Sequence, residues 1–156
     1  MLEEYKHFTV KKGIGKNDVS TLNAIDKAYL DAGVGDLNLI RVSSILPKGT
    51  DKVDRVGEEF GSFIPCVLAE AVGVKNEVAA GIGYGFDKDG GGYVVEHSLC
   101  MQDIDMEEFD NQIERKVKEM GRIRNIELEK VQVESIKTKI EASKYGCAVA
   151  ILVYLP

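Results

Sequence analysis

The stretch Ala79–Phe86, "AAGIGYGF", alternates small residues with larger ones. Successive side chains of a β-strand point to opposite faces of its sheet, so one face of this segment carries almost no side chains. That face holds Ala79, Gly81, Gly83 and Gly85, and the other holds Ala80, Ile82, Tyr84 and Phe86. The pattern predicts a strand with one nearly flat face, against which another layer of structure packs closely.

Two further segments repeat this alternation. Ala69 and Ala71 provide it in residues 63–72, and Gly146, Ala148 and Ala150 provide it near the C-terminus. Flat faces would let two sheets approach more closely than the usual spacing of about 10 Å, while the larger faces pack against helices. We therefore predict an α/β (α+β) fold, a four-layer αββα sandwich with closely packed Gly/Ala-rich sheets. The alternative is that the small residues only ease a bulge or a local backbone contact.

Hydrophobic periodicity places two helices among the strands. Ser20 or Thr21 caps the first helix, and Gly33 follows it as a left-handed C-cap. Asp105 caps the second. The predicted apolar stripes are Leu22, Ile25, Ala28, Tyr29 and Ala32 in the first helix, and Met106, Phe109, Ile113, Val117, Met120 and Ile123 in the second.

Strands are predicted at 7–12, 37–42, 63–72, 77–86, 93–99, 131–140 and 147–154, with a glycine-containing turn after the first and a polar loop over 48–61. No linker or low-complexity segment interrupts the 156 residues, so we expect a single domain over 1–156.

Composition excludes several classes of function. Twenty basic and 26 acidic residues give a net charge of −6, which argues against nucleic-acid and anionic-membrane partners. No apolar run approaches the roughly 20 residues of a membrane span, and "MLEEYKHF" is too charged for a signal peptide. Three scattered cysteines, without metal-ligand spacing to each other or to a histidine, predict buried free thiols, no metal and a cytoplasmic location.

Glycine-rich segments do not form a nucleotide site. "GIGYGF" lies within a predicted strand, and "GVGDLN" leads from a helix into a strand, the reverse of the order that phosphate binding requires.

A serine pair, Ser43–Ser44, follows the predicted strand in "NLIRVSSILPKG" (residues 38–49). From the residues alone, two small hydroxyl side chains simply end a strand, or they form a bond that the protein cuts in itself. Both interpretations remain open at this point.

The 26 residues from Leu22 to Pro47, "LNAIDKAYLDAGVGDLNLIRVSSILP", resemble the pyruvoyl-dependent arginine decarboxylase family. The shared motifs are Leu-Asn-Ala-x-Asp, Ala-Gly-x-Gly, Asn-Leu-Ile-Arg and Ser-Ser-Ile-x-Pro. The resemblance extends more loosely to the C-terminus through Pro65, Glu96 and "KYGCAVA".

This resemblance implies self-cleavage between Ser43 and Ser44, giving fragments 1–43 (beta chain) and 44–156 (alpha chain). The Ser44 hydroxyl attacks the Ser43 carbonyl, the resulting ester is eliminated, and Ser44 becomes a pyruvoyl group. The group is the electron sink for decarboxylation, so neither pyridoxal phosphate nor metal is expected. The family also implies an αββα fold assembled as a homotrimer with sites between subunits.

The implied reaction converts L-arginine to agmatine for polyamine synthesis. By resemblance, Glu96 is the proton donor, and burial among apolar strands is expected to raise its pKa. Asn38 is implied in processing, where its amide stabilises the oxyanion. Because about 20 Å of straight strand separates Asn38 from Ser44, either the strand reverses or Asn38 serves a neighbouring subunit.

Asp26 occupies the position that the resemblance assigns to the substrate guanidinium, which a carboxylate binds through two hydrogen bonds. Gly35 and Leu37 are expected to offer backbone contacts. Two alternatives remain: a pyruvoyl decarboxylase for another amino acid, such as lysine or histidine, and an unprocessed trimer that acts as a non-catalytic binding module.

Overall fold

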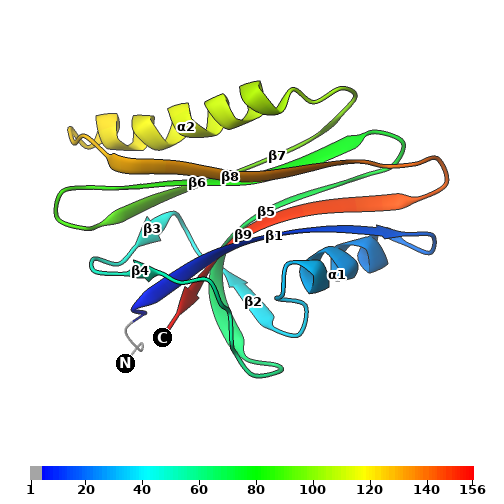
Figure 1. The fold of residues 1–156 in the computed structure, drawn as a ribbon, viewed down its shortest axis with the longest axis horizontal. Helices are drawn as coiled ribbons and strands as arrows, with labels where there is room; N and C mark the ends of the chain where they lie inside the picture. The colour runs from blue at the N-terminus through cyan, green and yellow to red at the C-terminus, as the bar shows by residue number, and fades with distance from the viewer. Residues whose placement is uncertain (1–4) are drawn as a thin grey trace.

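A computed structural model describes residues 5–156, in which the strands form two sheets (Figure 1). The first sheet has the order β2-β5-β9-β1-β4 and the second has the order β3-β7-β6-β8. The strands of the first are β1 (His7–Asn17), β2 (Asn38–Arg41), β4 (Asp51–Lys52), β5 (Phe63–Gly73) and β9 (Tyr145–Leu155). Those of the second are β3 (Ile45–Leu46), β6 (Glu77–Phe86), β7 (Gly92–Met101) and β8 (Glu129–Lys139).

Each sheet is covered by one helix on its outer face (Figure 1). Helix α1 (Thr21–Asp31) packs on β1, β9 and β5, and helix α2 (Met106–Ile123) packs on β6, β7 and β8. The layer order α1, first sheet, second sheet, α2 confirms the predicted four-layer sandwich. Neither helix in residues 5–156 is both long and apolar enough to cross a membrane.

The predicted caps are present. Ser20 Oγ accepts a hydrogen bond from the Asn23 backbone N–H (3.1 Å), and Asp105 accepts from the N–H groups of Glu107 and Glu108. These bonds satisfy backbone donors that have no partner within the first helical turn. Gly33 adopts φ +81°, the left-handed conformation expected after the first helix.

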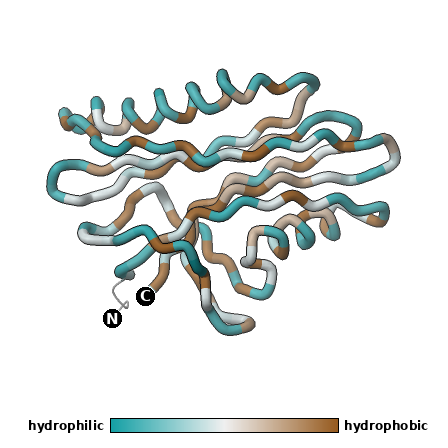
Figure 2. The backbone as a smooth tube through the Cα atoms, in the orientation of Figure 1, coloured by the Kyte–Doolittle hydropathy of each residue, from teal (hydrophilic) through white to brown (hydrophobic). Residues whose placement is uncertain are grey.

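The core between the sheets is built partly from the predicted small faces. Ala69, Ala71, Ala148 and Ala150 are buried there, opposite larger residues of β6 that include Ile82. In Figure 2 the hydrophobic colour is concentrated on these strands, whereas α2 is largely hydrophilic. Small residues on one sheet therefore meet larger ones on the other, which lets the two sheets pack closely.

Strand β6 is turned the opposite way from the prediction. Its glycine face meets α2 instead of the first sheet: a Cβ on Gly83 would lie 2.3 Å from Ile113 Cγ2, and one on Gly81 would lie 2.6 Å from Ile113 Cδ1. Its larger face joins the core between the sheets. The reason is that the bulky stripe of α2, which includes Phe109 and Ile113, needs a flat surface to approach the sheet.

The glycines after Lys12 are another correction. They form no turn, because β1 continues through them to Asn17. A Cβ on Gly13 would lie 2.1 Å from the Ala28 carbonyl oxygen, and one on Gly15 would lie 2.0 Å from that of Ala24. Glycine is needed at these positions so that α1 can lie directly on the strand.

Three residues that were predicted to be buried, Leu22, Cys100 and Ile123, are exposed. Leu22 and Ile123, assigned to apolar stripes, are 73% and 66% exposed. Helix α1 buries Ala24 and Ala28 instead of Leu22, and Ile123 is the last residue of α2, beyond the buried Gly121. Cys66 and Cys147 are buried free thiols as expected, whereas Cys100 is exposed. Burial raises the pKa of the Cys66 thiol to about 11 and that of Cys147 to about 12, so both remain protonated.

The close contact between β6 and α2 predicts that replacing its glycines by alanine destabilises the fold, and by an amount that depends on the space at each position. Gly83→Ala should lower the free energy of unfolding by about 1–3 kcal/mol, because α2 must shift to admit the Cβ. Gly85→Ala should cost less, since its Cβ would meet its nearest atom, in the Val131 side chain, at 3.0 Å. Urea denaturation monitored by circular dichroism measures both, and equal costs would contradict this packing.

Candidate active site

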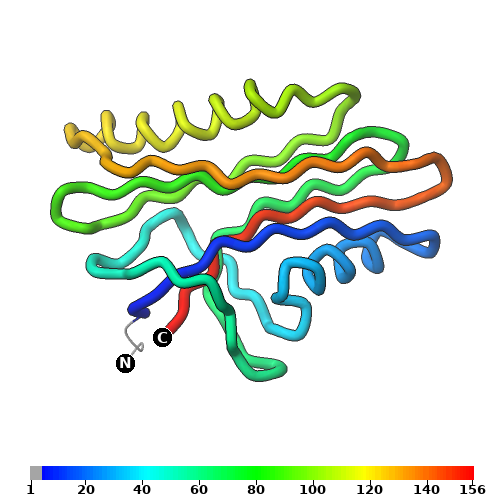
Figure 3. The backbone as a smooth tube through the Cα atoms, viewed as in Figure 1, coloured from blue at the N-terminus to red at the C-terminus, as the bar shows by residue number. Residues whose placement is uncertain are grey.

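The Ser43–Ser44 bond lies where the chain leaves the first sheet and enters the second. Strand β2 pairs with β5 up to Arg41, and the Val42 N–H still donates to the Cys66 carbonyl (2.9 Å). The chain then bends at Ser44, whose carbonyl accepts from the Val94 N–H (2.9 Å). Figure 3 shows this cyan segment running from β2 to β3. The Ser43–Ser44 bond therefore lies between two residues whose backbones are hydrogen-bonded to different sheets.

Tyr154 provides a further anchor immediately after the bond. Its hydroxyl donates to the Ile45 carbonyl at 2.7 Å. Burial raises the pKa of Tyr154 to about 12, so the hydroxyl stays protonated and remains a donor. Sequence reasoning missed this residue, because nothing in the order of residues connects positions 109 apart.

Strand pairing brings Glu96 towards the serine pair. β3 runs antiparallel to β7 with Ile45 opposite Tyr93, which places Ser44 beside Val94. Glu96 lies two residues beyond Val94 on the same face of β7. It is exposed, so the strands of its own chain do not bury it as predicted.

Asn38 is not brought to Ser44 within the chain. β2 continues straight from Asn38 to Arg41, and the Asn38 carboxamide donates to the Gly61 carbonyl at 2.8 Å. The chain beyond Arg41 crosses to the other sheet without reversing. Of the two geometries considered for Asn38, a reversal of the strand is therefore absent.

The predicted substrate-binding residues lie on the first-sheet side of the molecule. Asp26 is on the exposed surface of α1. Gly35 and Leu37 line a pocket of about 220 Å³ together with Leu30 and Phe60. The structure thus groups Gly35 and Leu37 but keeps them apart from Glu96, which belongs to the second sheet.

A polar cluster links helix α1 to the strand that precedes the serines. The Tyr29 hydroxyl of α1 donates to Glu70 Oε1 on β5 at 2.5 Å, and the Arg41 guanidinium lies 4.0 Å from Glu70 Oε2. Burial and the neighbouring Glu70 carboxylate both raise the pKa of Tyr29. The cluster connects α1, β5 and β2 two residues before Ser43.

Hydrophobic side chains around the serine pair are uncovered. Phe63 is 71% exposed, and Ile40, Val42 and Ile45 are each exposed by at least 41%. Ile40, Val42 and Phe63 lie on or next to β2, an edge strand of the first sheet, and Ile45 lies on β3, an edge strand of the second. Contiguous exposed apolar residues of this kind mark a surface that contacts another molecule.

Ser44 fits the requirements of a backbone-derived carbonyl cofactor. It is only partly buried, and its own carbonyl is already held by the Val94 N–H. Conversion of its Cα and side chain to a ketone would leave that hydrogen bond in place, with Glu96 on the adjoining strand. Such a group needs no separate binding pocket, because it is part of the chain.

Comparison with known proteins agrees with these features. A family model described as "Pyruvoyl-dependent arginine decarboxylase (PvlArgDC)" matches residues 7–156. A pyruvoyl-dependent arginine decarboxylase of Methanopyrus kandleri is 35% identical over 149 residues, covering 96% of each chain. One of Methanothermobacter thermautotrophicus is 38% identical over 136 residues, covering 86% of this chain and 87% of that protein.

A solved structure of a pyruvoyl-dependent histidine decarboxylase at pH 8 has a similar fold, with a TM-score of 0.51 and 19% identity. The similarity covers 64% of this chain and 53% of that one, and it supports the arrangement of the sheets alone. The family match spans nearly all of the described residues and includes the serine pair at the crossover between the sheets. This chain therefore belongs to the pyruvoyl-dependent arginine decarboxylase family.

Proposed function

We propose that this chain cuts itself between Ser43 and Ser44 and then decarboxylates L-arginine to agmatine. The observation that carries the proposal is the placement of the serine pair in an anchored crossover with Glu96 on the adjoining strand. Family membership supplies the reaction class, and the strand pairing that places Glu96 on the strand next to Ser44 supports the roles of these two residues. Agmatine is a precursor for polyamine synthesis, and we place the enzyme in the cytoplasm.

Self-cleavage uses groups of the chain and one molecule of water. The Ser44 hydroxyl attacks the Ser43 carbonyl, so that the amide becomes an ester. Loss of the Ser44 α-proton then releases residues 1–43 with a carboxylate end, and water replaces the nitrogen of Ser44, which leaves as ammonia. The hydrogen bonds at Val42 and Ser44 hold both sides of this bond, which favours the attack by limiting the geometries available to it.

The new ketone at position 44 supplies an electron sink for the electron pair that remains when the substrate loses carbon dioxide. Val94 keeps position 44 oriented through its N–H, and Tyr154 does the same for Ile45. We assign Glu96 as the acid that delivers a proton to the substrate α-carbon. Glu96 is exposed in the single chain, so in this proposal a neighbouring subunit covers it and closes the site around the reacting carbon.

We further propose a homotrimer whose sites lie between subunits. Asp26, Gly35, Leu37 and Asn38 lie apart from Glu96 in one chain, and the apolar surface around Ser43 is open. In this arrangement the Asp26 carboxylate of one subunit accepts two hydrogen bonds from the substrate guanidinium, while Gly35 and Leu37 contribute backbone contacts. Asn38 of a neighbour stabilises the oxyanion formed during cleavage.

Intact mass measurement under denaturing conditions tests the cleavage. The wild-type chain of 17.1 kDa should be replaced by fragments 1–43 and 44–156, the larger about 17 Da lighter than its serine-headed form. Ser44→Ala should remain a single uncut chain, because it lacks the nucleophile. Ser43→Ala is the matched control and should still be cut, since only its carbonyl takes part; cleavage of Ser44→Ala would refute the mechanism.

Glu96→Gln separates catalysis from processing. We expect normal cleavage but a fall in kcat of about 10²–10⁴-fold, because the amide cannot deliver the proton. Glu114→Gln, on the outer helix, removes a carboxylate of the same kind and should change neither step. Release of carbon dioxide from labelled arginine measures turnover, and full activity of the Glu96 variant would remove its assigned role.

Mixed trimers test whether the sites are shared. Ser44→Ala and Asp26→Asn chains should each be inactive alone, the first without the ketone and the second without the guanidinium partner. Co-expressed at equal amounts, they should recover about a quarter of wild-type activity, because one interface in four then joins an intact Asp26 to a processed Ser44. No recovery in stable trimers would show that each site is built within one chain.

A further inference from the structure

Self-cleavage at Ser44 leaves a new negative charge on the residue before it. When the ester breaks, the electron pair of the Ser44 Cβ–O bond stays on the Ser43 carboxyl group, so fragment 1–43 ends in a carboxylate. That carboxylate starts out beside the ketone that the substrate must reach. A cation close to the end of β2 could hold it elsewhere.

Arg41 lies two residues before Ser43, and its side chain extends forward along β2. In the parallel pairing of β2 with β5, Arg41 is opposite Cys66. Glu70 lies four residues further along β5, roughly 13 Å at about 3.3 Å per residue. The Arg41 guanidinium nevertheless lies 4.0 Å from Glu70 Oε2. A contact across that offset requires the side chain to point in the direction of the chain, past Val42 and towards the level of Ser43.

The Arg41 guanidinium has hydrogen-bond donors available for another acceptor. The side chain is 63% exposed, and its distance of 4.0 Å from Glu70 Oε2 is longer than a hydrogen bond. The other oxygen of that carboxylate, Oε1, accepts from the Tyr29 hydroxyl at 2.5 Å. A guanidinium carries five N–H donors in a planar fork, which matches the two oxygens of a carboxylate. Arg41 can therefore bind a second carboxylate while it remains beside Glu70.

Cleavage allows the end of β2 to stay with its own sheet. The Val42 N–H donates to the Cys66 carbonyl, so the contact with β5 already extends to the residue before Ser43. Position 44 stays with the second sheet, because its carbonyl accepts from the Val94 N–H. The intact Ser43–Ser44 bond forces the chain to leave β5 at this point. Once that bond is broken, Ser43 is free to continue along β5 beside Arg41.

The two ends also belong to different faces of the sheets. Arg41 lies on the face of the first sheet that α1 covers, where it is close to Glu70 and its partner Tyr29. Glu96 shares a face of β7 with Val94, whose side chain lies in the core between the sheets. A carboxylate that binds Arg41 is therefore drawn away from Glu96 and from the ketone at position 44.

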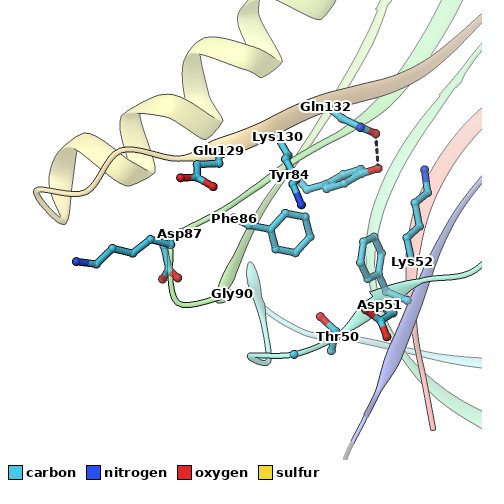
Figure 4. A pocket seen from close by; sticks show the side chains of 13 residues that line it. Thr50, Asp51, Lys52, Tyr84, Phe86, Asp87, Gly90, Glu129, Lys130 and Gln132 are labelled. Atoms are coloured by element: carbon cyan, nitrogen blue, oxygen red, sulfur yellow. Dashed lines mark hydrogen bonds between the residues drawn. The ribbon is translucent and has the colours of Figure 1, made fainter.

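A group of lysines at the end of the sandwich is not an alternative partner for the new carboxylate. They line a cavity of about 470 Å³ between β4 and the turn that joins β6 to β7 (Figure 4). The lining includes three lysines, Lys52, Lys88 and Lys130, and three acids, Asp51, Asp87 and Glu129. Lys52 is paired with Glu134 at 2.8 Å, and Lys130 lies in a bulge of β8 with φ +52°. Neither Arg41 nor the serine pair is among the lining residues.

On the basis of the cleavage proposed above, we propose that Arg41 is a positioning residue that binds the carboxylate formed at Ser43. The guanidinium holds the cut end on the first sheet through charge-assisted hydrogen bonds, beside Glu70 and Tyr29. The uncut chain offers Arg41 only an amide carbonyl at this position. The interaction therefore exists only after processing, and it separates the new carboxylate from the reacting group.

Melting temperatures of cut and uncut proteins isolate this interaction. In the processed protein, Arg41→Gln should lower the melting temperature by about 2–4 °C, because a charge-assisted pair is lost. In the uncut Ser44→Ala protein the same substitution should change it by less than about 1 °C, since an exposed contact at 4.0 Å contributes little. Arg115→Gln on α2 is the matched control and should act equally in both backgrounds. Differential scanning calorimetry at neutral pH measures all the variants.

Carboxypeptidase digestion tests directly whether the cut end is held. Carboxypeptidase Y should shorten fragment 1–43 at least about fivefold faster in Arg41→Gln than in the processed wild type, because proteolysis follows the population of the released end. Arg41→Lys keeps the positive charge without the planar fork, so its rate should lie between the two. Mass spectrometry of the fragment over time measures the rates.

Two sets of outcomes distinguish this role from the cleavage itself. Equal melting shifts in the cut and uncut proteins, or equal digestion of wild type and Arg41→Gln, would overturn the role of Arg41 and leave the cleavage intact. A wild-type chain that keeps a single mass of 17.1 kDa would instead overturn the proposed function, and the role of Arg41 with it.

Discussion

The chain crosses from one sheet to the other within four residues, and backbone hydrogen bonds hold both ends of that crossing. Val42 remains tied to β5 of the first sheet, while the Ser44 carbonyl is already bound by Val94 of the second. A flexible loop would let the Ser43–Ser44 bond adopt many geometries, whereas this bond cannot move independently of the core. The same pairing determines which residue of β7 lies next to Ser44, and so it places Glu96.

Close packing of the layers makes that crossing rigid. Glycines on β1 and β6 let the helices lie directly on the strands, and alanines on β5 and β9 let the sheets meet over a filled core. Interiors of this density transmit strain instead of absorbing it, because few voids are available for relaxation. The Ser43–Ser44 bond is therefore held between two sheets that are themselves closely packed.

A single chain holds two separated groups of proposed functional residues. Ser44 and Glu96 lie at the crossover, whereas Asp26, Gly35 and Leu37 lie around α1 and the turn that follows it. The exposed apolar residues next to Ser43 offer a surface through which a second copy could bring the groups together.

The sequence by itself determined the layer order, the helix caps, most strand positions and the family, because these follow from local periodicity and from one specific 26-residue block. It predicted that the small face of each strand lies between the sheets, which is right for β5 and β9 and wrong for β6. The β6 glycines meet α2 because packing is decided by complementarity between layers, which alternation along one strand does not contain. The contact of Tyr154 with Ile45 and the bulge at Lys130 could likewise not be predicted, since each depends on contacts between distant segments. Only the tertiary structure decided these, because side-chain neighbours across a sheet are set by register and not by position in the chain.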